Sequence, residues 1–150
     1  MITRTSAYAL EAAILIASRN GERVTAAELA DELAVPANYL SKILNRMARA
    51  RILESGRGPR GGFRLGREPS SIAIEDVVGL FEDVSGSRRC LLGRGKCTDA
   101  AGCAMHDRWK KVSGPLFDLL QNTTLASLVA DRGRRAQNGA TRKRTARARH

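Results

Sequence analysis

The sequence is poor in aromatic side chains and has no long apolar run. Its 150 residues include six aromatic residues, 4% of the chain, so we expect a core of aliphatic side chains on helices. No apolar run approaches the roughly 18–20 residues that a membrane-spanning helix requires. The apolar segment 7–17 is interrupted by Glu11, and no cleavage-site pattern follows it. We therefore expect a cytoplasmic protein.

Acidic residues are also scarce, and the positive excess is unevenly distributed. The formal net charge is +11, which favours a polyanionic partner. Residues 132–150 contain eight Arg or Lys and no acidic residue, so residues 1–131 carry only +3 of that charge. The last segment lacks apolar periodicity, and its composition predicts a disordered basic tail. DNA binding must therefore be inferred from motifs rather than from net charge.

Cysteine is rare and confined to one segment. The three cysteines, Cys90, Cys97 and Cys103, lie within fourteen residues, and His106, one of only two histidines, follows them. Six, five and two residues separate these four positions in order. An odd number of cysteines leaves one thiol over in any intramolecular disulfide scheme, and a reducing compartment disfavours disulfides. The thiolate and imidazole groups are therefore candidate metal ligands.

The spacing of these ligands favours an iron–sulfur cluster over zinc. Zinc sites usually pair ligands two to four residues apart, and this segment has no CxxC pair. Cysteines separated by Gly93, Gly95 and Gly102 on one long loop fit an iron–sulfur cluster better. Two alternatives stay open. The cysteines could be inert and partly buried, and His106 could be an ordinary surface histidine.

The first fifty residues have the pattern of a helix-turn-helix. Apolar periodicity predicts a first helix over residues 5–20, with Thr5 or Ser6 as its N-cap. Thr25 and Glu28 are spaced as a capping box for a short helix that ends near residue 34. After the turn at 34–36, a third helix over residues 37–50 follows. Its predicted buried stripe consists of Leu40, Ile43, Leu44 and Met47.

A β-hairpin is predicted directly after the third helix. Segments 52–55 and 62–65 alternate as short strands, and the turn 56–61 between them is glycine-rich and basic. A helix-turn-helix followed by such a hairpin is a winged helix. Beyond it, a helix over residues 74–82 would bury Val77, Val78 and Phe81.

Two more helices are predicted after the cysteine loop. One begins near residue 104 and should be kinked or broken at Gly114-Pro115, and a short one follows Thr124. Their excess of Leu and Val predicts dimer packing. The predicted fold is mainly α with a small β-wing: a winged helix-turn-helix with a C-terminal dimerisation helix. We divide the chain into a DNA-binding domain (1–70), a cluster-binding loop with dimerisation helices (71–131) and the tail (132–150).

Polar residues off the buried stripe of the third helix are the candidate DNA contacts. Amide, hydroxyl and ammonium groups can read base edges in a major groove, whereas arginines are more typical of phosphate contacts. Arginines on a glycine-rich wing suit a minor groove. The alternative is that these side chains form an ordinary solvated face. The candidates are Asn38, Tyr39, Ser41, Lys42, Asn45, Arg46 and Arg49 on the helix, and Arg57 and Arg60 on the wing.

These segments together resemble the bacterial IscR/NsrR/RirA family of winged-helix iron–sulfur regulators. The resemblance covers residues 1 to about 131 and is carried by five segments. They are TSAYALEAAILIA, LSKILNRMARARILESGRGPRGGFRLGR, SSIAIEDVVGLFE, the cysteine loop and TTLASLV. The wing sequence RGPRGGFRLG together with the three cysteines makes the resemblance specific.

The resemblance implies a homodimer that binds a partly palindromic operator. It implies Cys90, Cys97 and Cys103 as thiolate ligands and, from the two residues before it, His106 as fourth ligand of a 2Fe–2S cluster. The loop departs from the family pattern, because six residues rather than five separate the first two cysteines. Other members take a ligand from the first helix of the partner subunit, where Glu11 lies here. With Glu11, a 4Fe–4S cluster becomes the expectation; Glu11 could instead form a salt bridge or face solvent.

We therefore expect a cluster-dependent transcription regulator rather than an enzyme or small-molecule-binding protein. It would sense redox state, nitric oxide or iron and cluster status. A winged-helix regulator with structural zinc, or with thiols that sense oxidants through disulfides, is the alternative. An electron carrier is a further hypothesis, but the sequence has no second cysteine set.

Overall fold

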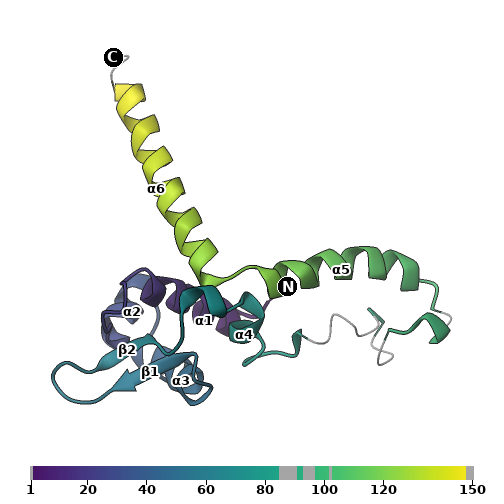
Figure 1. Ribbon diagram of the computed structural model, residues 1–150, viewed down its shortest axis with the longest axis horizontal. Coiled ribbons are helices and arrows are strands. Elements are labelled where there is room, and N and C mark those ends of the chain that lie inside the picture. The colour runs from purple at the N-terminus through teal and green to yellow at the C-terminus, as the bar shows by residue number, and fades with distance from the viewer. Residues whose placement is uncertain (1, 85–90, 93–96, 102, 148–150) are drawn as a thin grey trace.

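Helices dominate the fold, and one two-stranded sheet forms the wing (Figure 1). The computed structural model describes residues 2–84, 91–92, 97–101 and 103–147. Cys90 lies outside the described residues. The elements are α1 (Arg4–Ala17), α2 (Ala26–Leu33), α3 (Ala37–Arg49), β1 (Leu53–Gly56), β2 (Gly62–Leu65), η1 (Pro69–Ser71), α4 (Ile74–Val78), η3 (Asp99–Ala101), α5 (His106–Asn122) and α6 (Leu125–Arg147).

Helix α1 forms the centre of the apolar core. Its inner face is lined by alanines, whose small side chains let neighbouring helices approach closely, and Ile16 is 1% exposed. The prediction of Thr5 or Ser6 as N-cap is wrong. Thr3 caps the helix by accepting a hydrogen bond from the backbone N–H of Ser6 at 3.3 Å. The helix also ends earlier than predicted, at Ala17.

The predicted helix-turn-helix is confirmed. The Thr25–Glu28 capping box is present, with the Thr25 backbone N–H donating to Glu28 at 2.8 Å. Ala34 then adopts a left-handed conformation with φ of 52°, which turns the chain toward α3. Helix α3 buries all four predicted apolar residues, and each buried side chain of this size contributes about 1.5–3 kcal/mol to folding. They are Leu40, Ile43, Leu44 and Met47.

The wing is an antiparallel hairpin attached to the segment before α2. Its strands pair from Leu53–Leu65 to Gly56–Gly62. Val24 extends this pairing by exchanging backbone hydrogen bonds of 2.9 and 2.8 Å with Phe63. A Cβ atom on Gly62 would lie 2.7 Å from the Val24 carbonyl oxygen, and its φ is +121°. Only glycine fits where the wing crosses this segment.

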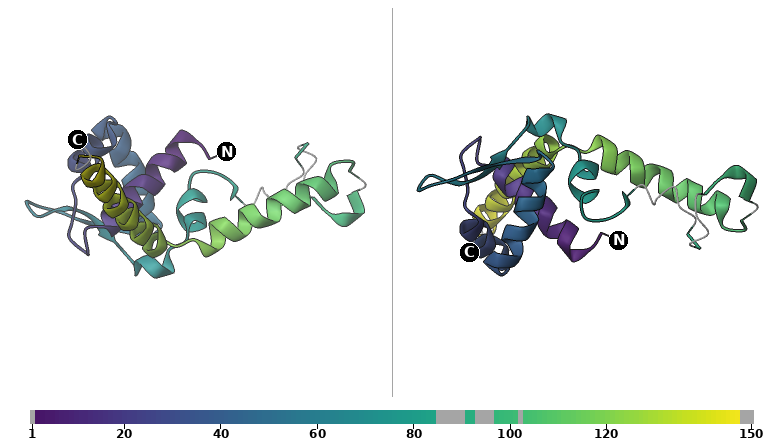
Figure 2. Two further views of the ribbon diagram at one scale, coloured as in Figure 1. Left: turned by 90° about the horizontal axis from the view of Figure 1, so that it is seen from above. Right: turned by 90° about the horizontal axis from the view of Figure 1, so that it is seen from below.

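The segment between α5 and α6 returns to the winged domain. The backbone N–H of Ile74 donates to Thr123 at 2.9 Å, and that of Leu125 donates to Ile72 at 2.9 Å. Ile72 and Leu125 are both fully buried. Helix α5 therefore projects from the domain but is anchored at its C-terminal end (Figures 1 and 2). Helix α4 ends at Val78, earlier than the predicted end near residue 82, and Phe81 is only half-buried.

Helix α5 is continuous through Pro115, so of the predicted kink or break the break is absent. Proline removes one backbone donor, and its ring crowds the carbonyl of Lys111 one turn earlier. Lys111 is exposed, so solvent can satisfy its carbonyl. A single missing hydrogen bond in a 17-residue helix is therefore tolerated.

Helix α6 extends through Arg147 and departs from the predicted disordered tail. Alanine, arginine and lysine are good helix formers, and they outnumber the glycines of this segment. Asp131 forms an i,i+3 ion pair with Arg134 near its start. Figure 1 shows α6 leaving the winged domain on the side away from α3 and the wing. Within the described part of the chain, no helix is both long and apolar enough to span a membrane.

Candidate nucleic-acid interface and cysteine loop

Six of the seven predicted DNA-contacting residues on α3 are solvent-exposed: Asn38, Tyr39, Lys42, Asn45, Arg46 and Arg49. Within the part of the chain that the structure describes, Lys42, Asn45 and Arg49 have no ion pair or side-chain hydrogen bond. The Asn38 side chain accepts a hydrogen bond from the Tyr39 backbone N–H at 2.8 Å. The exposed surface of α3 thus presents three cationic and two amide side chains, which suits contacts with phosphates and base edges.

The hydroxyl groups of Tyr39 and Ser41 have partners within the chain. The Tyr39 hydroxyl hydrogen-bonds the Thr5 hydroxyl at 2.8 Å, and its ring meets Tyr8 edge-on, with centroids 6.2 Å apart. Ser41 donates to the Ala37 carbonyl at 2.8 Å, one turn earlier. Tyr39 therefore braces α3 against α1 in this structure. Its side chain is still exposed, so its assignment to DNA contact stays a prediction.

Arg46 links α3 to the chain that precedes the cysteine loop. Its guanidinium carbon lies 5.1 Å from the centroid of the Phe81 ring, which is cation–π geometry. The next residue, Glu82, accepts hydrogen bonds from the Thr3 backbone N–H at 2.9 Å and hydroxyl at 3.2 Å. Residues 81 and 82 therefore contact both α3 and the N-terminus of α1. Sequence periodicity indicated neither contact.

The wing tip carries the two predicted arginines on a tight turn. Arg57 and Arg60 are both exposed. The Gly61 backbone N–H donates to the Gly58 carbonyl at 2.8 Å, and a Cβ atom on Gly61 would lie 2.7 Å from the Gly56 carbonyl oxygen. The glycines thus allow a closed turn from which both guanidinium groups reach solvent.

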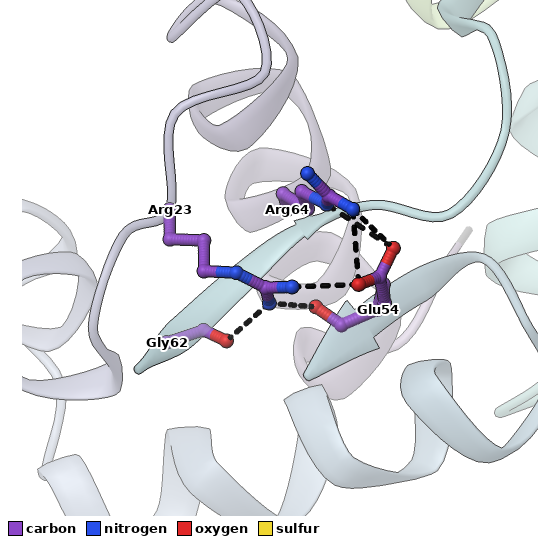
Figure 3. A network of polar contacts seen from close by, with 4 residues as sticks. All are labelled: Arg23, Glu54, Gly62 and Arg64. Atoms are coloured by element: carbon purple, nitrogen blue, oxygen red, sulfur yellow. Dashed lines mark hydrogen bonds and ion pairs between the residues drawn. The ribbon is translucent and has the colours of Figure 1, made fainter. Parts of the chain in front are cut away.

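An ion-pair network that the sequence analysis missed fixes the base of the wing (Figure 3). Arg23 donates to the Glu54 carboxylate at 2.6 Å and to the carbonyl groups of Glu54 and Gly62 at 3.2 and 3.3 Å. Arg64, opposite Glu54 in the sheet, donates to the same carboxylate at 2.9–3.1 Å. We call Arg23, Glu54 and Arg64 the wing brace. The opposite charges of Glu54 and Arg64 on paired strands could have indicated their ion pair from the sequence. Arg23 could not be found in this way, because it lies outside the hairpin.

The brace lowers the pKa of its acidic member. Hydrogen bonds from Arg64, and then from Arg23, hold the pKa of the Glu54 carboxyl below its usual range. A lowered pKa in the folded state means that the carboxylate stabilises the fold at neutral pH. That contribution is lost as the pH falls through the lowered pKa. The wing brace is therefore an acid-sensitive element.

In the cysteine loop, the structure brings two of the four predicted ligands together. His106 begins α5, and its Nδ1 atom lies 3.1 Å from the Cys97 Sγ atom. Cys103 is half-buried, and its carbonyl accepts a hydrogen bond from the His106 backbone N–H at 3.0 Å. Cys90, the remaining predicted thiolate, lies outside the described residues.

Asp99, from the turn before α5, and Lys110, from α5, form polar contacts beside His106. Asp99 accepts hydrogen bonds from His106 Nε2 at 2.8 Å and from Lys110 at 2.9 Å. The bond from Lys110, and then that from His106, lowers the pKa of the Asp99 carboxyl. These residues line a hollow of about 500 Å³ beside α5, together with Cys97, Thr98, Ser113, Gly114, Phe117, Asp118 and Gln121.

The donor set of the loop fits an iron–sulfur cluster in chemical type. Cys97 supplies a thiolate and His106 an imidazole nitrogen, both ligand types of 2Fe–2S centres. Two ligands of one metal lie roughly 3.6 Å apart at tetrahedral angles, so the pair, whose atoms lie 3.1 Å apart, would have to open slightly to hold one. Among the described residues, no group of three or more Cys, His, Asp or Glu side chains could hold a metal ion.

Glu11, the alternative fourth ligand, lies in a different hollow of its own subunit. It is exposed on α1 and lines a cavity of about 570 Å³ between α1, α2 and α6, with Glu32, Arg132 and Arg135 at its polar positions. Leu33 and Leu128 contribute apolar surface to the same cavity. Within one subunit, Glu11 therefore sits among α6 arginines and not beside Cys97 or His106.

The comparisons with known sequences point to transcriptional regulators. Residues 2–131 match the model of the family Rrf2, which is described as an iron-dependent transcriptional regulator. An HTH-type transcriptional regulator of Aquifex aeolicus is 32% identical over 127 residues, or 83% of this chain and 88% of that protein. The regulator IscR of Escherichia coli O1:K1 is 30% identical over 151 residues, covering 96% of this chain and 93% of IscR.

Solved structures share the fold. CymR, the global cysteine regulator of B. subtilis, has a TM-score of 0.73 at 22% identity and covers 87% of this chain and 96% of its own. IscR of T. potens has a TM-score of 0.68 at 22% identity and covers 87% of each chain. At these identities the likeness establishes the winged-helix architecture alone.

The wing brace gives a prediction about stability and pH. Replacing Glu54→Gln should lower the urea midpoint of unfolding at pH 7, because the charged partner of Arg23 and Arg64 is lost. The difference from the unsubstituted protein should shrink as the pH falls through the lowered pKa of Glu54. Urea unfolding followed by circular dichroism from about pH 3 to pH 7 measures this.

Glu22→Gln is the matched control, because Glu22 is exposed and lies near Arg23 without joining the brace. This control should leave the midpoint unchanged at both ends of the pH range. If Glu54→Gln lowers the urea midpoint by the same amount at pH 3 and at pH 7, the contribution of the brace is not ionic.

Proposed function

Because this chain belongs to the Rrf2 family of iron-dependent transcriptional regulators, we propose that it binds operator DNA as a homodimer under the control of an iron–sulfur cluster. Members of this family are regulators and not enzymes. The observation that carries the proposal is the 3.1 Å distance between Cys97 Sγ and His106 Nδ1. These atoms lie at the start of α5, whose C-terminal end is hydrogen-bonded to the winged domain.

DNA contact is proposed for the outer face of α3 and for the wing. Lys42, Asn45 and Arg49 are exposed on α3, and a major groove is wide enough for one helix. Arg57 and Arg60 are exposed at the wing tip, where glycines permit close approach to a minor groove. The wing brace supports this assignment, because it fixes the direction of the hairpin relative to α2 through Arg23.

Dimerisation is proposed along α5. Val112, Leu116 and Leu119 are 62%, 43% and 56% exposed, and their spacing places them on one face of the helix. An exposed apolar stripe on a projecting helix favours burial against a second copy. Burial of this stripe against the same stripe of a second chain gives a twofold-symmetric arrangement, which suits a palindromic operator.

The cluster is proposed to be held by Cys90, Cys97, Cys103 and His106, with a 2Fe–2S centre favoured over 4Fe–4S. Such a cluster would supply a charge and redox state that oxidation, nitric oxide or iron shortage changes. The protein residues would transmit that change by their own contacts. After the loop, the chain continues into α5 at His106. Before the loop, the chain contains Phe81 and Glu82, which contact Arg46 and Thr3.

This arrangement gives the loop two mechanical routes to the DNA-binding surface. A shift of residues 81–82 would move Arg46 on α3 and the N-terminus of α1. A shift at the start of α5 would change the angle between the two proposed subunits. Since half-sites on DNA are spaced by whole helical turns, either change alters operator affinity.

Thiol or zinc sensing is the second candidate. A solved structure of CymR from Staphylococcus aureus in its oxidized form shares this fold, with a TM-score of 0.66, and both described cysteines of this chain are half-buried rather than sealed in the core. Zinc-loaded or disulfide-bonded protein would be colourless, so the absorbance spectrum separates this candidate from the cluster.

The ligand assignment predicts loss of colour. Protein with Cys97→Ala, purified without oxygen, should lack the visible absorbance and the stoichiometric iron of the unsubstituted protein, because one thiolate ligand is removed. Thr98→Ala is the control, since Thr98 is adjacent and exposed but is not a soft ligand. Full retention of the chromophore by the Cys97 variant would show that this residue is not a ligand.

The wing assignment predicts a change in salt dependence. Replacing both Arg57 and Arg60 with Ala should weaken binding to all duplexes. It should reduce the slope of log K against log salt by roughly four, because the dimer loses two contacts per subunit at about 0.9 per phosphate contact. Fluorescence anisotropy over a salt series measures this, with an operator obtained by selection from random DNA. The double variant Arg108→Ala/Lys111→Ala on α5 removes equal charge and should leave the slope unchanged; the reverse outcome would refute the assignment.

The dimer assignment predicts dissociation by a buried charge. Leu119→Arg should raise the dimer dissociation constant about tenfold or more, because the substitution enters a symmetric interface twice. Sedimentation velocity across a concentration series measures this. Asn122→Arg adds the same charge near the end of α5 and is the control. Equal self-association of both variants would place the interface elsewhere.

A further inference from the structure

The imidazole of His106 is held at both of its nitrogen atoms. Nε2 lies 2.8 Å from Asp99 Oδ1, and Nδ1 lies 3.1 Å from Cys97 Sγ. The His106 side chain is only 13% exposed, whereas that of Asp99 is 81% exposed. The ring is therefore largely enclosed, with one edge directed at the thiol and the other at a carboxylate on the solvent side.

The carboxylate that holds the ring is itself fixed. Lys110 Nζ donates to the same Asp99 Oδ1 atom at 2.9 Å. His106 and Lys110 are four residues apart, so they lie on the same face of α5, one turn from each other. Asp99 begins η3, the short turn before α5, and thus bridges this turn to the first two turns of the helix.

The hydrogen bonds define which nitrogen can bind a metal. A carboxylate can only accept a hydrogen bond, so Nε2 must carry the hydrogen in its contact with Asp99. In the neutral ring, Nδ1 then keeps its lone pair, and that lone pair points toward Cys97. A second residue that fixes the ring in this way orients a histidine ligand and raises its basicity.

We propose that Asp99 is a positioning residue that holds His106 as a neutral, Nδ1-coordinating ligand beside Cys97. This inference rests on the proposed function, because it assigns a role at the proposed cluster site. Nothing in the spacing of the cysteines and His106 indicates this residue, which lies two positions after Cys97 and is not itself a ligand. Lys110 supports it by holding the shared carboxylate oxygen.

The assignment has a consequence for the choice of fourth ligand. A histidine with one nitrogen fixed by a carboxylate and the other directed at a ligand thiol needs only a small movement to coordinate a metal beside that thiol. Glu11 is instead placed beside Arg132 and Arg135 in its own subunit. The local arrangement therefore supports His106 as the ligand supplied from within the subunit.

The first test uses the reduced, metal-free protein. Long-range ¹H–¹⁵N correlation spectra at roughly pH 8, where imidazole is neutral, report the tautomer of each histidine, and His106→Gln identifies the His106 signals. We expect the Nε2–H tautomer in the unsubstituted protein. Asp99→Ala should shift His106 toward a mixture of tautomers, and Asp99→Glu, which keeps the carboxylate, should restore much of the original signal. Asp118 lines the same hollow, so Asp118→Ala is the control and should leave the His106 tautomer unchanged.

The second test uses the iron-loaded protein. Asp99→Ala should lose its iron at a roughly 10- to 100-fold lower chelator concentration, because removing a residue that supports a metal ligand usually lowers metal affinity by that factor. Its reduction potential should rise, because a less basic imidazole stabilises the oxidised centre less. Circular dichroism should show the same fold, since Asp99 is mainly exposed. Asp118→Ala should retain the iron and the potential of the unsubstituted protein.

The outcomes separate the two levels of the proposal. If the unsubstituted protein takes up no iron at all, the cluster function itself fails. If it takes up iron, but Asp99→Ala changes neither the His106 tautomer nor iron retention and potential, the role of Asp99 is overturned while the cluster function stands. A changed tautomer with unchanged iron retention and potential also overturns it, because the imidazole would then not be the ligand that Asp99 positions.

Discussion

The rest of the structure depends on the backbone pairing between residues 72–74 and 123–125. Two hydrogen bonds of 2.9 Å and the fully buried side chains of Ile72 and Leu125 hold the C-terminal end of α5 on the winged domain. Seventeen helical residues extend about 25 Å, so the N-terminal end of α5, which carries His106, stands well away from that anchor. A helix fixed at one end converts a small tilt at the junction into a large displacement at the other.

The segment that precedes the cysteine loop also contacts the winged domain. There, Phe81 and Glu82 contact Arg46 of α3 and Thr3 at the start of α1. Cation–π and exposed hydrogen-bond contacts are each worth only about a kcal/mol. Contacts of this strength join two parts without locking them, which suits an equilibrium that a bound group must be able to shift.

Local patterns in the sequence predicted the winged domain well, because its determinants are local. The Thr25–Glu28 capping box, the buried stripe of α3 and the glycine-rich hairpin each depend on residues a few positions apart. Predictions failed where distant residues or solvent decide. Thr3 became the N-cap of α1 while contacting Glu82, and α5 continues through Pro115 because its turn is exposed. The basic segment after residue 131 has the helix propensity of its Ala and Arg residues, which a charge-based prediction of disorder ignored.

The sequence indicated candidate ligands for the site but not the contacts around them. Spacing indicated Cys97 and His106, and their role as ligands stays a prediction, whereas the contacts of Asp99, Arg23 and Glu54 are created only by folding. Tyr39 shows a contact that its helical position did not indicate: its hydroxyl is hydrogen-bonded to that of Thr5, and its role in DNA contact stays a prediction. Exposure on a helix face identifies a candidate, and the partner of each polar atom decides between recognition and packing.

The contact between Gly62 and the Val24 carbonyl also bears on protein engineering. The direction of the hairpin is fixed by Val24, which pairs with it through the backbone, and by the Arg23 side chain. Both residues lie nearly forty positions before Gly62 in the chain. A chimaera that receives residues 53–65 alone would therefore acquire the turn without its orientation. Transplanting the module requires residues 23–25 of the donor as well, so the smallest exchangeable unit is discontinuous in the chain.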